Sequence, residues 1–358
     1  MNPISTVLGL SAVGLSLAGI LVYQLVPFIP RLGIRALYRV RAVRIAVAST
    51  ALALALAARR RSRTSRSWSY LTVVLALTPL SGAVHATRIL VPLDDPEHLP
   101  AGDAAVDDDT MVVGIETDGR AHAWQVRTLV THHIVHDQVG DRPVIAAWCA
   151  VCNSGMVYDG RVDGRRLHFD PEAVWRENMI MRDRETGTLW QHATGEALVG
   201  PLEGTHLDVL GGRLMTWGAW RSDHPETTVT RDPTDREWAG ILPKETTYRA
   251  LTDGGILTAI APRLARRDDR LGPLTEVVGV ELAGHARAYP LETLEEHGIL
   301  EDEIGGVPVR VAFDRRRNRA DVETSGEPAT VKRTRWLEWS EFHPETSVFS
   351  PHRRARTE

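Results

Sequence analysis

The stretch that decides the fold is Met111–Trp148, "MVVGIETDGRAHAWQVRTLVTHHIVHDQVGDRPVIAAW", because the chain contains it twice. The second copy is Glu276–Phe313, "EVVGVELAGHARAYPLETLEEHGILEDEIGGVPVRVAF", which aligns with the first without a gap. Self-similarity of this kind indicates a duplicated structural unit. Matching pairs include Gly114 with Gly279, Glu116 with Glu281, Gly119 with Gly284, His132 with His297, Asp137 with Asp302 and Pro143 with Pro308.

Each copy has the residue pattern of β-structure. "VVGIE", a Gly-containing turn and "AHAW" alternate along the chain in a way that predicts a β-hairpin. A short helix is expected around Thr128–Val135, followed by the strand "PVIAAWC". "VYDGRVDGRRLHF" and "NMIMRDRETGTLWQ" predict two more hairpins. We therefore predict a mainly β, β-rich α+β module, made twice and packed as a pseudo-twofold pair, with transmembrane helices at the N-terminus.

The two copies differ in length around the only two cysteines of the 358 residues, Cys149 and Cys152. Glu276 lies 165 positions after Met111, but Trp336 lies only 119 positions after the matching Trp217, so the second copy lacks 46 residues. Where the first copy has "CAVCNSGMVYD", the second has "DRRRNRADVET". Chemistry is therefore expected in the first copy, and the second is expected to act as scaffold.

Three apolar runs precede the repeats. Ile4–Pro30 carries no charge and is long enough to cross a hydrocarbon core, Ile45–Ala58 is short for a span, and Tyr70–Ala86 is near the minimum length. A cleaved signal peptide is the alternative for the first run. That run has no basic n-region and is longer than an ordinary h-region, which argues against cleavage.

Two arginine clusters bear on the orientation of these runs. One follows the first run, from Arg31 to Arg44, and the other, "RRRSRTSR" from Arg59 to Arg66, precedes the third. Basic clusters stay in the cytoplasm. If the middle run does not cross the membrane, both arginine clusters lie in the cytoplasm. If it does cross, the two clusters lie on opposite sides, and the stronger second cluster should set the orientation. Both alternatives send Tyr70–Ala86 outward, so we predict a cell-membrane protein whose soluble domain faces outside the cytoplasm.

These patterns divide the chain into five parts. Residues 1–91 are predicted to be a membrane anchor of two or three hydrophobic helices, and 92–110, rich in Asp, Pro and Gly, an acidic linker. Residues 111–232 form the first repeat with the Cys-x-x-Cys site, 233–275 a connecting segment, and 276–350 a second, degenerate repeat.

Composition limits the partners. The formal net charge of −4, without a basic face in the soluble part, argues against nucleic-acid binding. The expected partners are the lipid bilayer and a small-molecule substrate, and the oligomeric state is open. We find no Gly-rich phosphate loop and no Gly-x-Ser-x-Gly elbow, so the reaction, and whether the protein is an enzyme at all, stay open.

The Cys-x-x-Cys motif carries the most specific chemistry. It lets two sulfurs face one point, which is either a metal ion or the other sulfur. Thiolates suit copper or zinc, and imidazoles complete such sites. We predict Cys149, Cys152, His132, His136 and His168 as metal ligands. His132 also fits a structural role, because it recurs as His297 in a copy without cysteines.

Two alternatives stay open for the cysteines. In an oxidising exterior they can form a structural disulfide in a binding or assembly module. They can also act as a thiol oxidoreductase, although the hairpins around them differ from the βαβ setting of thioredoxin-like sites.

Several motifs in order resemble a prokaryotic family known only as domain of unknown function three-one-seven-nine. The likeness covers roughly Met111 to Ser350 and rests on "HHIVHD" from His132, "CAVC" from Cys149, "MRDRETGTLW" from Met181, "GPL" from Gly200 and the Trp-x-x-Trp motif before "HPET". It implies a secreted or membrane-anchored protein with a His/Cys site, carried onto His132, Cys149 and Cys152. His133, His136 and Ala150 depart from the family's Glu, Asn and Pro, which puts the nature of the metal site in doubt.

The prediction is thus a membrane-anchored extracytoplasmic metalloprotein of unknown reaction. It binds copper or zinc through His and Cys ligands, and an open metal position would suit redox chemistry on a small molecule. The alternatives are a binding module with a structural disulfide and a thiol oxidoreductase.

Overall fold

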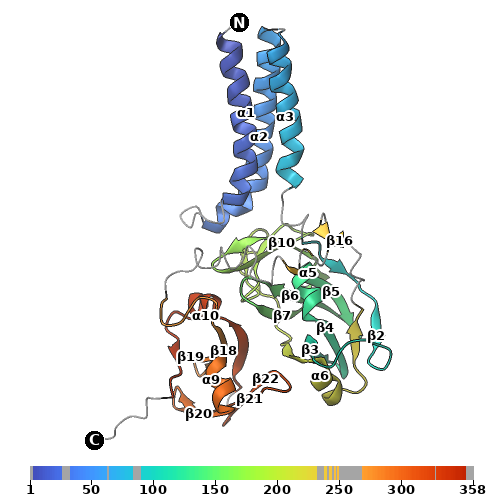
Figure 1. The fold of residues 1–358 in the computed structure, drawn as a ribbon, viewed down its shortest axis with the longest axis vertical. Coiled ribbons are helices and arrows are strands. Elements are labelled where there is room, and N and C mark those ends of the chain that lie inside the picture. The colour runs from blue at the N-terminus through green and yellow to red at the C-terminus, as the bar shows by residue number, and fades with distance from the viewer. Residues whose placement is uncertain are drawn as a thin grey trace, which may run out of the picture.

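Three long helices stand on a β-rich body (Figure 1). The computed structural model describes residues 3–25, 33–62, 64–83, 90–231, 238–239, 242–243, 246, 248–249, 268–326 and 328–351. The long helices are α1 (Pro3–Leu25), α2 (Gly33–Arg61) and α3 (Ser65–Ala83). The short helices are α5 (Val126–His132), α6 (Trp217–Asp223), α9 (Leu291–His297) and α10 (Trp336–Phe342).

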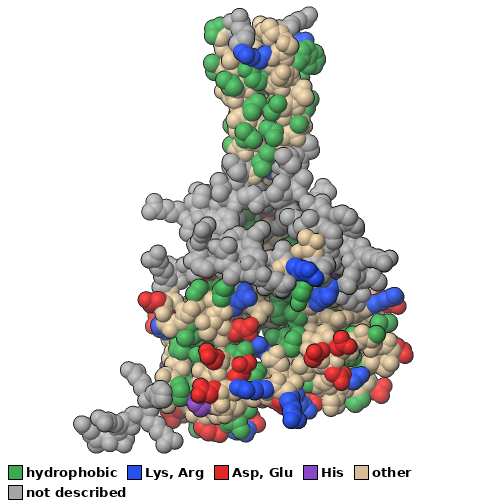
Figure 2. Space-filling view, viewed as in Figure 1, with side chains coloured by type: hydrophobic (Ala, Val, Ile, Leu, Met, Phe, Trp, Pro, Cys, Tyr) green, Lys and Arg blue, Asp and Glu red, His purple; other side chains and the backbone are tan. Residues whose placement is uncertain are grey.

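Two of the long helices are apolar enough, by length and composition, to cross a membrane: the Pro3–Ile20 part of α1, and α2. A signal sequence near the N-terminus passes the same test. The short middle run is only the centre of α2, because arginines, which are good helix formers, continue the helix on both sides. Figure 2 shows hydrophobic side chains along this helical stalk.

Five sheets of the body are named blades 1 to 5 here. In strand order they are β14-β3-β4-β15-β2 (blade 1), β1-β5-β6-β7 (blade 2), β10-β11-β12-β13 (blade 3), β23-β18-β19-β24 (blade 4) and β20-β21-β22 (blade 5). Two ribbons, β8-β9 and β16-β17, complete the described strands.

The strand bounds follow the chain. In the first half they are β1 (Leu93–Asp94), β2 (His98–Pro100), β3 (Met111–Thr117), β4 (Arg120–Gln125), β5 (Ile134–Val139), β6 (Arg142–Cys149), β7 (Ser154–Asp159), β8 (Arg161–Val162), β9 (Arg165–Arg166), β10 (Phe169–Trp175), β11 (Asn178–Asp183), β12 (Leu189–Gln191) and β13 (Ala197–Val199). In the second half they are β14 (Arg213–Thr216), β15 (Thr228–Thr230), β16 (Trp238–Ala239), β17 (Leu242–Pro243), β18 (Glu276–Leu282), β19 (His285–Pro290), β20 (Ile299–Ile304), β21 (Val307–Asp314), β22 (Arg319–Thr324), β23 (Thr330–Arg335) and β24 (Ser347–Val348).

The five blades follow one another around a ring that resembles a five-bladed propeller. Strand contacts join β4 of blade 1 to β5 of blade 2, β5 to β10 of blade 3, β19 of blade 4 to β20 of blade 5, and β22 of blade 5 to β14 of blade 1. Blades 3 and 4 meet where Asn178 donates a hydrogen bond to Glu338. The prediction of a β-rich α+β fold is confirmed, and the ring is the feature that it lacked.

The duplication explains the number of blades. The first copy supplies blades 1 and 2, and the second supplies blades 4 and 5. The residues that only the first copy has contain β10 to β13, which form blade 3. The copies therefore lie in one ring with blade 3 between them, and do not form a separate pseudo-twofold pair.

In each copy, a tryptophan ring packs directly against a glycine of the first strand of the repeat. A Cβ at Gly114 would lie 2.5 Å from the Trp220 ring, and one at Gly279 would lie 2.2 Å from the Trp339 ring. Both indole N–H groups donate to a threonine hydroxyl at 2.9 Å. The repeated Gly and Trp-x-x-Trp positions thus record the same packing made twice.

The acidic segment after the anchor is part of the fold. We call residues 90–101 the strap, because β1 and β2 lie in them and pair with blades 2 and 1. Leu93 and Leu99 pack against two hydrophobic clusters of the body. Apolar residues at these two positions give the segment buried contacts that a free linker does not have. Most of the predicted connecting segment 233–275 lies outside the described residues.

The start of α2 packs against blade 3. Leu37 and Val40 lie in one hydrophobic cluster with residues of β11, β12 and β13. Arg41 forms an ion pair at 2.7 Å with Glu172, whose side chain is fully buried, and Arg35 pairs with Glu203. Part of the first arginine cluster is therefore bound to the body.

Candidate metal centre

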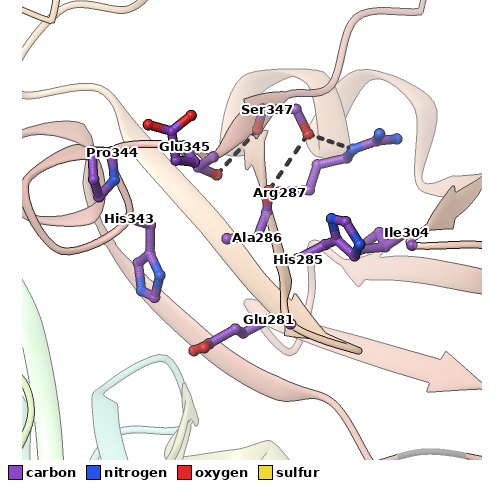
Figure 3. A pocket seen from close by; sticks show the side chains of 12 residues that line it. Glu281, His285, Ala286, Arg287, Ile304, His343, Pro344, Glu345 and Ser347 are labelled. Carbon is purple, nitrogen blue, oxygen red and sulfur yellow. Dashed lines mark hydrogen bonds between the residues drawn. The ribbon is translucent and has the colours of Figure 1, made fainter.

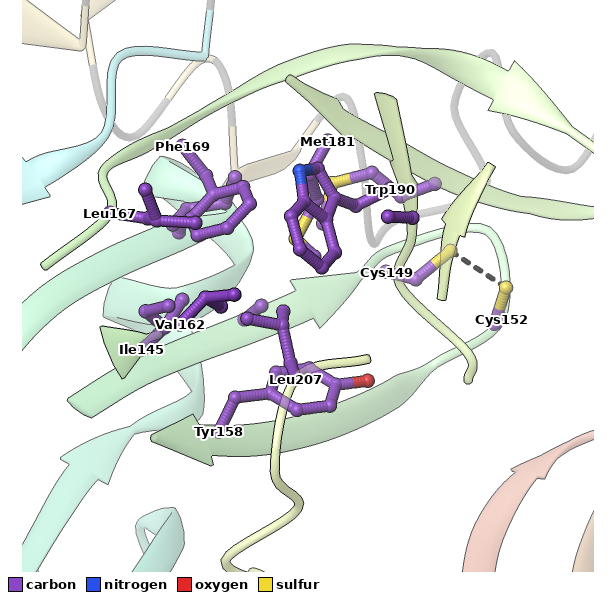
Figure 4. Packing of buried hydrophobic residues seen from close by; sticks show 14 of the residues in the cluster. Ile145, Cys149, Cys152, Tyr158, Val162, Leu167, Phe169, Met181, Trp190 and Leu207 are labelled. Carbon is purple, nitrogen blue, oxygen red and sulfur yellow. Dashed lines mark hydrogen bonds between the residues drawn. The ribbon is translucent and has the colours of Figure 1, made fainter. Parts of the chain in front are cut away.

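The two cysteines meet inside the protein, at the turn between β6 and β7. Cys149 ends β6, and the Cys152 N–H donates to the Cys149 carbonyl at 3.2 Å, which closes the turn. The sulfurs lie 2.7 Å apart as free thiols, both buried. Figure 4 shows the pair at the edge of an apolar cluster that includes Trp190 and Met181.

A carboxylate from the second copy joins the cysteines. Ligand atoms of Cys149, Cys152 and Glu338 all lie within 4.8 Å of one another. Glu338 lies on α10, inside the second Trp-x-x-Trp motif, where the first copy has Ala219. The second copy, which is expected to act as scaffold, therefore supplies one residue of the candidate group.

Lys332 accompanies this carboxylate. It lies on β23 and forms an ion pair with Glu338, whose side chain is 2 % exposed. The matching residue of the first copy, Arg213, is exposed. Sequence analysis missed both residues, although a comparison of "WGAW" with "WLEW" singles out Glu338 as the charged residue of an otherwise apolar turn.

Asn178 connects the cysteines with Glu338 and His192. Its side-chain amide lies 3.2 Å from the Cys152 sulfur, 2.7 Å from Glu338 Oε2 and 3.3 Å from His192 Nδ1. Because an N–H group faces Nδ1, His192 carries its proton on Nε2, which lies 3.2 Å from the Ala147 carbonyl. Ser154 also donates to Glu338, at 2.9 Å. The cluster is a buried polar network shared by blades 2, 3 and 4.

The electrostatics favour a neutral thiol at Cys152 and a charged carboxylate at Glu338. Burial, together with Cys149 and Glu338, raises the pKa of Cys152 well above its ordinary value. Burial would also raise the pKa of Glu338, but Lys332, His192 and the hydrogen bonds to the carboxylate together outweigh it, and the pKa is lowered. Burial lowers the pKa of His192 to about 4. Thiolates here therefore need an additional cation close by.

The histidines predicted as ligands have other partners. His132 Nδ1 donates to the Val91 carbonyl at 2.6 Å, and His168 Nδ1 donates to Glu185 at 2.8 Å. His136 Nδ1 donates to Asp94 at 2.7 Å, and its Nε2 accepts the Phe169 N–H at 2.7 Å. The structure thus brings together the two predicted cysteines and places these three rings on other groups.

His133 follows α5 in an uncommon backbone conformation. Its φ of 62° matches the 71° of Gly298, the corresponding residue of the second copy. The ring is buried, which lowers its pKa to about 4. Its Nδ1 has no hydrogen-bond partner within the described part of the chain. A non-glycine residue in this region is strained, and here the strain holds an imidazole in the interior.

A second group of potential ligands consists of His98, His122 and Asp137. His98 Nε2 lies 2.6 Å from Asp137 Oδ1, and both ring nitrogens of His122 face threonine hydroxyls. In the second copy, Arg287 and Asp302 form an ion pair at the places of His122 and Asp137. This group is therefore the counterpart of a structural ion pair.

A cavity of about 350 Å³ is lined by residues of blades 4 and 5, and neither cysteine lines it. His285, Arg287, His343 and Ser347 are among the residues around it, as Figure 3 shows. Arg287 is already paired with Asp302, and the lining mixes acidic and basic groups without a common charge.

The fold and the buried cluster define a class: a five-bladed, propeller-like body with a Cys/Cys/Glu group between its blades and apolar helices before it. The family described as "Protein of unknown function (DUF3179)" matches residues 91–325, and the chain belongs to it. No curated protein and no solved structure matches the chain. The match begins within the strap, which agrees with the strap being part of the domain.

Proposed function

We propose that this chain is a membrane-anchored extracytoplasmic metalloprotein that binds copper or zinc through Cys149, Cys152 and Glu338. One observation carries the proposal: two sulfurs and a carboxylate oxygen converge within 4.8 Å in the interior. Sulfur ligands suit both metals. Glu338 takes the place of the histidines predicted as ligands, because the Nδ1 atoms of His132, His136 and His168 all contact other groups.

The charges around the cluster favour a divalent ion. Lys332 offsets the charge of Glu338, so two thiolates would leave two negative charges in the interior. A divalent cation neutralises them, whereas a monovalent ion leaves one buried charge without compensation. Three protein ligands leave one position of a tetrahedral ion for water or a substrate, which is the arrangement of catalytic zinc sites.

The experiment is metal analysis of the purified full-length protein. We expect stoichiometric metal in the wild type and none after Cys149→Ser or Cys152→Ser, because the remaining ligands cannot hold the ion alone. Asp314→Ser is the matched control, since Asp314 occupies the position of Cys149 in the second copy, and this variant should keep its metal. Equal metal content in the wild type and both cysteine variants would sink the proposal.

A disulfide is the second candidate, and the 2.7 Å contact between the sulfurs favours it. Intact mass and thiol alkylation separate the two functions. A disulfide gives a mass two daltons lower and no alkylation after unfolding, whereas a metal site gives two alkylated thiols once the ion is removed.

The charges near the helices support an outward-facing body. Arg59, Arg60 and Arg61 end α2 at the end of the stalk that lies away from the body (Figure 1). Arg35 and Arg41, near the body, pair with glutamates. The far cluster is then the cytoplasmic one under the positive-inside rule. Protease added outside intact spheroplasts should cleave the body, and protection of the body would place it in the cytoplasm.

A further inference from the structure

The strap closes the open edges of two blades. Its strand β1 pairs in parallel with β5 at the edge of blade 2, and β2 pairs with β15 at the edge of blade 1. Because the strap follows α3 along the chain, it links the helices to the ring. Unpaired edge strands expose N–H and C=O groups, so release of the strap would change the surface of both blades.

One short run, residues 132–137, binds the strap at three places. His132 donates to the Val91 carbonyl, His136 donates to Asp94, and Asp137 accepts from His98. The backbone takes part as well, since the Asp95 N–H donates to the His136 carbonyl at 2.8 Å. Two of the three side chains of this run that hold the strap are histidines.

The second copy shows that these histidines accompany the strap. Its equivalents of His132 and His136 are His297 and Glu301. His297 donates to a carbonyl of its own helix, α9, and Glu301 is exposed. Where the first copy has His122 beside Asp137, the second has the permanent cation Arg287 beside Asp302. The strap is thus held by groups that titrate, whereas in the second copy the equivalent histidine contacts its own helix and the equivalent glutamate is exposed.

The contacts of His136 are compatible only with a neutral ring. Its Nε2 accepts the Phe169 N–H, so its single proton is on Nδ1 and faces Asp94. A second proton would face the Phe169 N–H and break that bond.

The charged groups around this ring come from several elements. Asp94 of the strap is the anion in contact with it, Arg184 forms an ion pair with the same carboxylate, and the His168 ring lies 5.2 Å away. His168 is itself paired with Glu185, and Arg184 also with Asp170. The cationic neighbours oppose protonation of His136, and Asp94 favours it.

We propose that the strap is a pH-sensitive latch, closed at neutral pH and released as the pH falls, with His136 as its main proton acceptor and His122, which lies against His98 and Asp137, as the second.

The direction of the pH effect follows from the folded-state titration. Burial lowers the pKa of His136 and of His122 despite their aspartate partners. At pH values between the ordinary histidine pKa of about 6.5 and the lowered pKa, the closed strap therefore binds fewer protons than the released strap. The closed state is fully favoured above that range and weakens as the pH falls through it. Asp94 and Asp137 keep their charges there, because their pKa values lie well below the ordinary one.

Hydrogen exchange of the full-length protein in detergent, measured by mass spectrometry at pH 7.5, 6.5 and 5.5, tests the latch. After correction for intrinsic rates, protection of residues 90–101 should fall up to about tenfold per pH unit for each linked proton. Protection of β18–β19, whose strands pair with each other, β23 and β24, should stay constant. A strap whose protection is the same at all three pH values would overturn the proposal.

Variants assign the effect to its residue. His136→Gln keeps a donor for Asp94 and an acceptor for Phe169 but cannot gain a proton, so the pH dependence should shrink. His168→Gln, which alters the neighbouring ring, should keep it. Asp94→Asn should lower protection even at pH 7.5. If His136→Gln fails to fold, His122→Gln serves instead and should remove the smaller part of the pH dependence. A wild-type response in the glutamine variants would refute the latch.

Discussion

Glu338→Ala should lower the free energy of unfolding by about 3–5 kcal/mol, the cost of breaking a buried ion pair by removing one partner. Lys332 would keep its charge in the interior, and Asn178 and Ser154 would lose their common acceptor. Denaturant unfolding of the detergent-solubilised protein, followed by tryptophan fluorescence, measures the change.

Two variants control this result. Glu301→Ala removes a glutamate that is 74 % exposed in its ion pair with Arg310, and it should change stability by less than about 1 kcal/mol. The double variant Lys332→Met, Glu338→Leu removes both charges and should recover much of the loss. A loss below about 1 kcal/mol for Glu338→Ala itself would show that the Lys332 charge does not need this carboxylate for its compensation in the interior.

Trp339→Ala should cost about 3–5 kcal/mol, because it empties the space over Gly279 that the indole fills. The reverse change, Gly279→Ala, should cost about 1–3 kcal/mol, since its methyl group would lie 2.2 Å from that ring. Thermal unfolding of both variants measures the effects.

The matched control is Gly102→Ala, where an added Cβ meets nothing within 4 Å. It should be nearly neutral. Trp220→Ala repeats the large loss in the first copy, where the ring packs over Gly114 in the same way. If Trp339→Ala and Gly102→Ala were equally mild, the indole would not be what closes the second copy.

Trp339 is also the neighbour of Glu338 on α10, so the two large effects should not add. Residues that share a packed element and a hydrogen-bond network interact when both are changed. In the double variant, most of the helix contacts that position Glu338 are already lost, and its total loss should be smaller than the two single losses together.

Much of the architecture could be predicted from the sequence because it depends on local repetition. The alternating strands, the gapless duplication and the extra residues of the first copy point to a β-rich body made of two similar parts. The apolar runs predict helices. That the extra residues make a fifth blade could not be predicted, since closing a ring depends on contacts between strands distant in the chain.

Only the two cysteines of the candidate site could be predicted from the sequence. Two cysteines three positions apart approach each other through one turn, which is a local property of the chain. Histidines near them in sequence were the natural further ligands. In the structure, His136 faces the strap from β5, because neighbouring side chains on a strand alternate between faces. His168 lies just before β10 and pairs with Glu185, in the turn after β11.

The sequence by itself determined the elements of this protein: the duplicated strands, the apolar helices and the paired thiols, each set by the period or spacing of nearby residues. Only the tertiary structure decided what faces the thiols. Glu338 and Lys332 lie more than 180 positions from Cys149, and they reach it because the ring brings blade 4 beside blades 2 and 3. A buried network of this kind is built from side chains on separate elements, and no local pattern encodes which of them will meet.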